Sequence, residues 1–221
     1  MHLILCRHGN TFDKQDKVVF AGSRQDLPLV ARGREQAEAC GQAIKAAGFE
    51  PAAICCGPLS RTKESARIIA AQTGFLSEVT IDERLNEIDY GSWAGLSSEE
   101  IAGLFGIDML EAWNKHSVWP QGCNWTESEK EVIAAVHSFA SDLSRLYAGD
   151  ETVIAVSSNG RLRYFLTLLE GEYEKRALAG TFKVGTGHVC CLQSSGVDWK
   201  LAFWNLSPEE LDLNWNHTER R

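Results

Sequence analysis

Two stretches of the sequence place polar residues directly after a short apolar run. The first, LILCRHGNT, ends its apolar run at Arg7, His8 and Gly9, and the second, VIAVSSNGRLR, ends its run near Ser158 and Asn159. In α/β proteins, polar groups at the ends of sheet strands are where ligands are held. The guanidinium of Arg7 can bind an anion, and the neighbouring imidazole of His8 can attack it. Gly9 allows a ligand to approach the backbone closely.

Two further stretches supply the groups that phosphoryl chemistry needs. GPLSRTKESARII places Arg61 early in an expected helix, and LNEIDYGSWAGLS places Glu87 in a loop punctuated by glycine. Two guanidiniums can hold the oxygens of a phosphoryl group while a histidine attacks phosphorus and a carboxylic acid protonates the departing oxygen. This chemistry requires no metal ion, and we expect neither a metal nor a cofactor.

The elements that must position these residues alternate along the chain. Apolar runs predict strands at 2–6, 53–56, 153–156 and 188–192, and apolar periodicity predicts helices at 30–47, 59–72, 127–147 and 161–169. Strands that alternate with helices form βαβ crossovers and a parallel sheet covered on both faces. We therefore predict an α/β fold, a three-layer sandwich with a mostly parallel central sheet and helices on both faces.

Residues 92–130 interrupt this alternation. The segment is rich in Gly, Ser and Asn, contains Trp113, Trp119 and Trp125, and has one short amphipathic pattern at 98–105. Tryptophan clusters usually belong to a core, so we expect a small cap insertion packed on a single domain that spans 1–221. The alternative is that the cap acts as a lid over a pocket.

Composition excludes several classes of function. The 221 residues are 44% hydrophobic and carry a formal net charge of −8, which argues against nucleic-acid binding because that requires clustered Lys and Arg. No apolar run approaches the roughly 20 residues that span a bilayer, so we expect a cytoplasmic protein that does not bind membranes. The seven cysteines form no closely spaced ligand pairs, which argues against a zinc site. Nothing in the sequence indicates an oligomeric state.

The motifs in the first 95 residues resemble those of the histidine phosphatase, or phosphoglycerate-mutase-like, superfamily. RHGNT matches R-H-G-x-T, DLPLVARGREQA matches D-x-P-L-T-x-x-G-x-x-Q-A, GPLSRTKESA matches S-P-L-x-R-A-x-x-T-A, and LNEIDYGSWAG matches L-x-E-x-x-x-G-x-W-x-G. The resemblance implies that His8 is the phosphorylated nucleophile, that Arg7 and Arg61 bind the phosphate, and that Glu87 is the general acid. Asn10, Thr11 and Gly22 are candidates for substrate contact.

The second apolar stretch departs from the family pattern. Where the superfamily has V-S-H-G, this sequence reads VSSNG, so Ser158 stands in place of a second histidine that donates to the phosphate. We expect Ser158 to lie against the phosphate as a weaker donor. Asn159, or the start of the helix at Gly160, could compensate for the lost histidine. His188, which begins another expected strand, is a further substitute, although strand histidines are more often packed than catalytic.

The leading interpretation is a metal-independent phosphomonoesterase that acts on a small phosphorylated metabolite, its one expected partner, with activity weakened by Ser158. One alternative is a phosphoglycerate-type mutase, against which the Phe12-Asp13-Lys14 sequence counts because mutases have a Trp-Asn pair there. The other is a phosphate-binding protein without catalysis. The intact His8 and Glu87 argue against it because binding alone needs neither residue.

Overall fold

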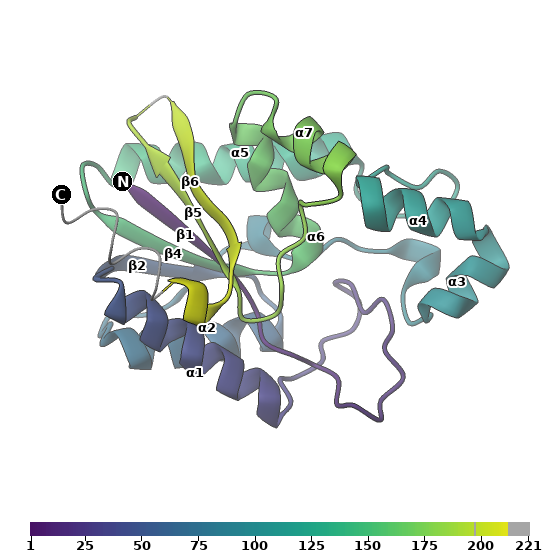
Figure 1. The fold of residues 1–221 in the computed structure, drawn as a ribbon, viewed down its shortest axis with the longest axis horizontal. Coiled ribbons are helices and arrows are strands. Elements are labelled where there is room, and N and C mark those ends of the chain that lie inside the picture. Colours follow the sequence, from purple (N-terminus) through teal and green to yellow (C-terminus); the bar gives the residue numbers. More distant parts are fainter. Residues whose placement is uncertain (197, 212–221) are drawn as a thin grey trace.

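The computed structural model describes residues 1–196 and 198–211. At its centre is a six-stranded sheet with the strand order β3-β2-β4-β1-β5-β6 (Figure 1). The strands are β1 (His2–Arg7), β2 (Pro51–Cys56), β3 (Thr80–Ile81), β4 (Thr152–Ser157), β5 (Val189–Ser194) and β6 (Trp199–Leu206). All neighbouring pairs from β3 to β1 are parallel, whereas β5 is antiparallel to β1 and to β6. The fold is therefore α/β with a mostly parallel sheet, as predicted.

Helices cover both faces of the sheet (Figure 1). The α-helices are α1 (Ala31–Ala46), α2 (Ser60–Thr73), α3 (Ser98–Phe105), α4 (Ile107–His116), α5 (Glu129–Leu146), α6 (Asn159–Leu162) and α7 (Glu172–Ala179). Short 3-10 helices are η1 (Glu83–Leu85), η2 (Gly91–Trp93) and η3 (Arg163–Leu168). The helices α1 and α2 lie on one face, and α5 lies on the other.

Alternation along the central strands divides the core into two halves. On β1, Ile4 and Cys6 pack with Ile44 of α1, whereas Leu3 and Leu5 belong to the cluster on the α5 side. Successive side chains of a strand point to opposite faces, so one apolar run can fill both layers. All six residues of β4 are buried, which explains why its sequence is continuously apolar. The seven cysteines are also buried, and all are free thiols.

The predicted elements are found with ends that shift by a few residues, except for the helix expected at 161–169. That segment is a single turn of α6 followed by the 3-10 helix η3. The hydroxyl of Thr167 donates to the carbonyl of Tyr164 at 2.6 Å and so competes with the α-helical hydrogen bond of that carbonyl. The sequence did not predict β6, α4 or α7. Helix α7 has no fully buried residue, and its Tyr173 and Ala177 pack against the core only partly buried, so its apolar pattern is weak.

Helices α3 and α4 extend beyond the end of the sheet, within the segment predicted to form a cap (Figure 1). The tryptophans of this segment pack edge to face: the rings of Trp113 and Trp125 are 4.8 Å apart at 88°, and those of Trp119 and Trp125 are 4.8 Å apart at 73°. Trp113 is almost fully buried. These rings form the core of the cap. Among the described residues, no helix is long and apolar enough to cross a membrane.

Candidate active site

The carboxyl ends of β1 and β4 lie side by side and bring the two polar stretches together. Arg7 pairs in register with Ser157, and the next backbone N–H, that of His8, donates to the carbonyl of Ser157 at 3.1 Å. The chain then leaves the sheet through Gly9, where any Cβ would overlap the backbone of Gly33. A glycine is required here because the start of α1 passes against this turn.

The imidazole of His8 is buried and held in one tautomer. Its Nδ1 lies 2.7 Å from the carbonyl oxygen of Gly9, which can only accept, so Nδ1 carries the proton and Nε2 keeps its lone pair. Burial, followed by the positive charges of Arg61 and Arg7, lowers the pKa of His8 well below its ordinary value. His8 is therefore neutral at neutral pH, the form in which an imidazole is nucleophilic.

Two arginines adjoin His8, and backbone carbonyls hold both. Arg61, in the first turn of α2, donates from Nη1 to Gln25 at 2.9 Å and from Nη2 to Gly22 at 2.8 Å. Arg7 donates from Nη1 to Val184 at 2.7 Å. Among the described residues neither guanidinium forms an ion pair, so both charges are available to an anionic ligand. Burial lowers the pKa of each, although both remain cationic near neutral pH.

The carboxyl of Glu87 reaches the same site from the loop between η1 and η2. It is buried, and its Oε1 and Oε2 accept the backbone N–H groups of Ile88 at 2.9 Å and Gly160 at 3.3 Å. A Cβ at Gly160 would overlap the carboxylate of Glu87 and the hydroxyl of Tyr90. Glycine at 160 is thus needed for the acid to approach the end of β4.

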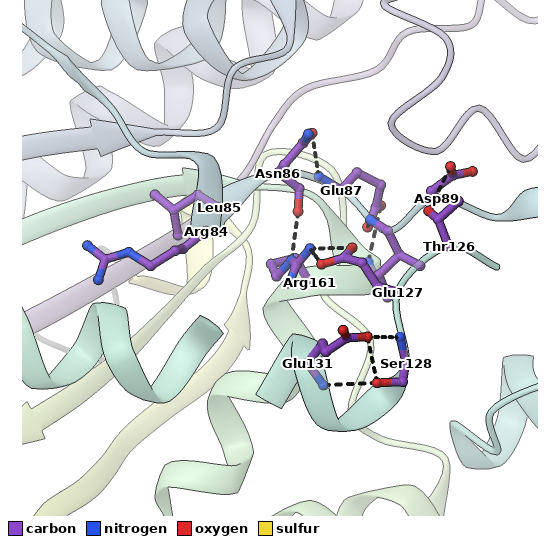
Figure 2. Close-up of polar contacts among 12 residues, drawn as sticks. Arg84, Leu85, Asn86, Glu87, Asp89, Thr126, Glu127, Ser128, Glu131 and Arg161 are labelled. Carbon is purple, nitrogen blue, oxygen red and sulfur yellow. Dashed lines mark hydrogen bonds and ion pairs between the residues drawn. The ribbon is translucent and has the colours of Figure 1, made fainter. Parts of the chain in front are cut away.

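Behind Glu87, Arg161 of α6 fixes the loop that carries it (Figure 2). The Nε of Arg161 donates to the carbonyl of Asn86 at 2.7 Å, and its Nη2 contacts both carboxylate oxygens of Glu127 at 3.0 and 2.8 Å. Glu127 precedes Ser128, whose side chain and that of Glu131 form the capping box of α5. One arginine therefore links the acid loop to two helices.

These groups open into one cavity of about 290 Å³, near the lower end of the range for small-molecule sites. Residues predicted for the site and found in its wall are Arg7, His8, Thr11, Gly22, Arg61, Glu87 and Asn159. Residues of the wall that the sequence analysis did not assign to the site include Phe12, Val18, Phe20, Tyr90, Trp113, Asn114, Arg163 and Lys183. One signal was present: Arg163 follows Asn159 by four residues, so a helix that begins there places both on one side.

Ser158, in contrast, does not line this cavity. It follows β4 at the expected position, but its Oγ is buried and has no hydrogen-bond partner among the described residues. The hydroxyl is therefore outside the cavity wall, and its contact with a phosphate stays a prediction. At the start of α6, the N–H of Gly160 is bound to Glu87 and is not free to donate to a ligand. Asn159 does face the cavity, and its Oδ1 accepts the N–H of Val184 at 2.9 Å.

Two other predicted residues also lie outside the cavity wall. His188 borders a separate cavity with Arg32 and Glu35, and its Nδ1 lies 3.3 Å from the carbonyl of Asn205. It therefore cannot replace the missing histidine. The Oδ1 of Asn10 accepts the hydroxyl of Thr186 at 2.6 Å, and this bond joins two loops. Strand and loop positions alone do not fix the direction of a side chain, so the sequence could not place these two residues relative to the cavity. The described residues contain no group of three or more His, Cys, Asp or Glu that could hold a metal ion.

Comparison with known proteins identifies the family. The profile of the histidine phosphatase superfamily (branch 1) matches residues 3–207. Phosphoglycerate mutases named 2,3-bisphosphoglycerate-dependent are 32% identical in Methylobacterium sp. (strain 4-46), over 76% of this chain and 80% of the relative, and 31% identical in Parvibaculum lavamentivorans, over 88% and 91%.

Among solved structures, a mycobacterial glucosyl-3-phosphoglycerate phosphatase in complex with VO3 is 25% identical. It aligns with a TM-score of 0.78 over 93% of this chain and 99% of its own. The relatives thus include both mutases and phosphatases. With its fold and nearly its whole length matched, the chain belongs to the histidine phosphatase superfamily.

Proposed function

We propose that the protein is a metal-independent phosphomonoesterase that works through a phosphohistidine on His8. The observation that supports this most strongly is the state of His8: Nδ1 is bound to a carbonyl, the ring is neutral, and Arg7 and Arg61 adjoin it in a cavity. A site that only bound phosphate would gain from a protonated histidine, whereas this environment opposes protonation. The relatives named as phosphatases and mutases support phosphoryl transfer.

In the first step, Arg7 and Arg61 bind the phosphoryl oxygens, and Nε2 of His8 attacks phosphorus as the ester P–O bond breaks. Glu87 gives its proton to the departing alkoxide, which leaves as an alcohol. In the second step a water molecule attacks the phosphohistidine and the N–P bond breaks. Glu87, now a carboxylate, takes a proton from that water, and inorganic phosphate leaves with the histidine neutral again.

A phosphoglycerate mutase is the second candidate, and the curated relatives at 31 and 32% identity favour it. A mutase must keep its phosphohistidine until the reaction intermediate has reoriented in the site and can take the phosphoryl group back. The lost donor at Ser158 argues against that, because a charge-assisted hydrogen bond contributes about 1.5–3 kcal/mol and a neutral one about 0.5–1.5.

The test is a panel of phosphomonoesters assayed for free phosphate in buffer treated with a chelator. We expect phosphate release by the wild-type protein and none by His8→Ala. A parallel assay follows the conversion of 3-phosphoglycerate to 2-phosphoglycerate with added 2,3-bisphosphoglycerate. Isomerisation faster than phosphate release would replace the phosphatase by the mutase. Phosphate release that needs added magnesium would contradict the metal-independent mechanism.

A further inference from the structure

Two cationic side chains line the cavity in addition to the arginines that adjoin His8. Arg163 follows α6, and Lys183 lies in the loop before β5. Neither forms an ion pair with any of the described residues. Both are therefore available to a negative charge within the cavity.

Arg163 is the more constrained of the two. It is 1% exposed, and its guanidinium lies between the rings of Trp113 and Phe182, at 4.0 and 4.4 Å from their centroids. Its Nη1 donates to the hydroxyl of Ser117 at 3.2 Å, whereas Nη2 has no hydrogen-bond partner among the described residues. Burying a charge without a counter-ion is unfavourable, and aromatic faces offset only part of that cost.

Lys183 lines the cavity together with Arg163 and Arg7 and is repelled by their positive charges. Burial, followed by repulsion from Arg163 and Arg7, lowers the pKa of its amine. All three cations line the same cavity. A group of like charges that exceeds the carboxylates around it is the arrangement that an anionic ligand stabilises.

The charges of the cavity wall do not balance for a simple phosphate ester. Its described residues include four cationic side chains, those of Arg7, Arg61, Arg163 and Lys183, against one carboxylate, that of Glu87. A phosphomonoester dianion neutralises two of the four positive charges. When Glu87 is protonated as the acid, the remaining two have no partner.

We propose that Arg163 and Lys183 bind a second anionic group of the substrate, a carboxylate or a second phosphate on a short carbon skeleton. This inference rests on the proposed function, because it assumes that the first phosphate binds at His8. The apolar side chains of Phe12, Val18 and Phe20 line the same cavity and can cover the carbon atoms between the two charges. A substrate of this class is a phosphorylated acid or a bisphosphate, in contrast to a neutral sugar or aryl phosphate.

The test compares substrates that differ in one group. The compounds 3-phosphoglycerate and glycerol 3-phosphate differ by a carboxylate in place of a hydroxymethyl group, and propane-1,3-diol bisphosphate supplies a second phosphate. We expect kcat/KM to be at least roughly tenfold higher for one of the two doubly anionic compounds than for glycerol 3-phosphate. Lys183→Met should reduce that preference by roughly tenfold. Lys115→Met, in which a cap lysine outside the cavity is changed, should leave the preference as it is.

Binding to the inactive His8→Ala protein, measured by calorimetry, gives a readout that does not require turnover. The doubly anionic compound should bind more tightly than glycerol 3-phosphate, and adding Lys183→Met should remove the difference. Arg163→Lys should weaken the preference in the same direction, because a point charge cannot reproduce the stacked guanidinium. Equal binding and equal kcat/KM for all three compounds would overturn the inference while leaving the phosphatase intact. Absence of phosphate release from every monoester would instead overturn the proposed function.

Discussion

The carboxyl of Glu87 is the residue whose role can be separated most cleanly from the rest of the site. Replacing it by Gln keeps the shape and removes the proton, so the effect should depend on the leaving group. We predict a loss of at least roughly a hundredfold for alkyl phosphates and a much smaller loss for p-nitrophenyl phosphate, whose leaving group scarcely needs a proton. Steady-state kinetics with both substrates measures this. Equal losses would remove Glu87 from the role of general acid.

Ser158 supports a second prediction at this scale. Its hydroxyl is buried without a partner, next to the strand end that holds His8, and an imidazole at this position extends further than a hydroxyl. The charged donor should stabilise phosphoryl oxygens by about 1–2 kcal/mol more than a neutral one. Ser158→His is therefore expected to raise turnover or the lifetime of the phosphohistidine roughly tenfold.

The control for this variant is its thermal unfolding, which shows whether the larger ring is accommodated. A stable Ser158→His protein that is no more active than wild type would mean that the cavity already supplies the lost donor. Asn159→Ala in the wild-type background would then be strongly impaired, because Asn159 is the neighbouring polar residue that faces the cavity.

At the scale of elements, Arg161 determines where the acid loop lies relative to α6 and α5. It is 2% exposed, holds the carbonyl of Asn86, and pairs with Glu127 (Figure 2). We predict that Arg161→Met lowers kcat for alkyl phosphates by roughly tenfold with little change in KM, because Glu87 loses its alignment while phosphate binding remains. Aryl phosphates should be affected less, as in the Glu87 variant.

A matched control is Arg84→Met. Arg84 also forms ion pairs near this loop, with Asp82 and Asp142, but its side chain points away from Glu87 (Figure 2). The Arg84→Met variant should have nearly the wild-type kcat for both alkyl and aryl phosphates. If Arg84→Met costs as much activity as Arg161→Met, or if Arg161→Met reduces both substrate types equally, Arg161 is structural and does not position the acid.

Much of the site could be predicted because parallel strands end at a common edge. That rule predicts the meeting of His8, Arg61 and Glu87 from separate stretches of sequence. It does not give the direction of side chains within turns, which is why it could not show that Ser158 and His188 lie outside the cavity wall. Periodic patterns likewise cannot identify a short element that has no fully buried residue, which explains the absence of α7 from the predicted fold.

Arg163 and Lys183 lie far from the catalytic motifs in the sequence, and the sequence analysis did not assign either of them to the site. Lys183 precedes β5 and Arg163 follows α6, and they reach one cavity only because the sheet order places β4, β1 and β5 side by side. The four-residue spacing from Asn159 is the one local signal for Arg163, and no local pattern marks Lys183 as part of a site. At the scale of the whole molecule, the formal charge is −8, yet the described wall of this cavity carries four cationic side chains against one carboxylate.

Stability of the whole molecule should depend on pH through His8. Burial lowers its pKa in the folded state, so below about pH 6.5 the unfolded chain binds a proton that the folded protein does not. Folding is then destabilised by up to about 1.4 kcal/mol for each pH unit below that value. The His8→Asn variant lacks this titration.

Urea unfolding at about pH 7.5 and about pH 5.5 should therefore show that the free energy of unfolding of His8→Asn rises relative to that of the wild type as pH falls. A stability difference that does not change with pH would contradict a neutral, buried His8.

The most direct measurement is a rapid acid-free quench of the wild-type protein during turnover of a labelled phosphomonoester, followed by mass spectrometry of its peptides. We predict a phosphoryl group on His8 that is stable to alkali and labile to acid, that forms and decays at rates compatible with turnover, and that is absent from His8→Ala. Phosphate release without any phosphoenzyme, a phosphoryl group on another residue, or undiminished turnover by His8→Ala would contradict the mechanism.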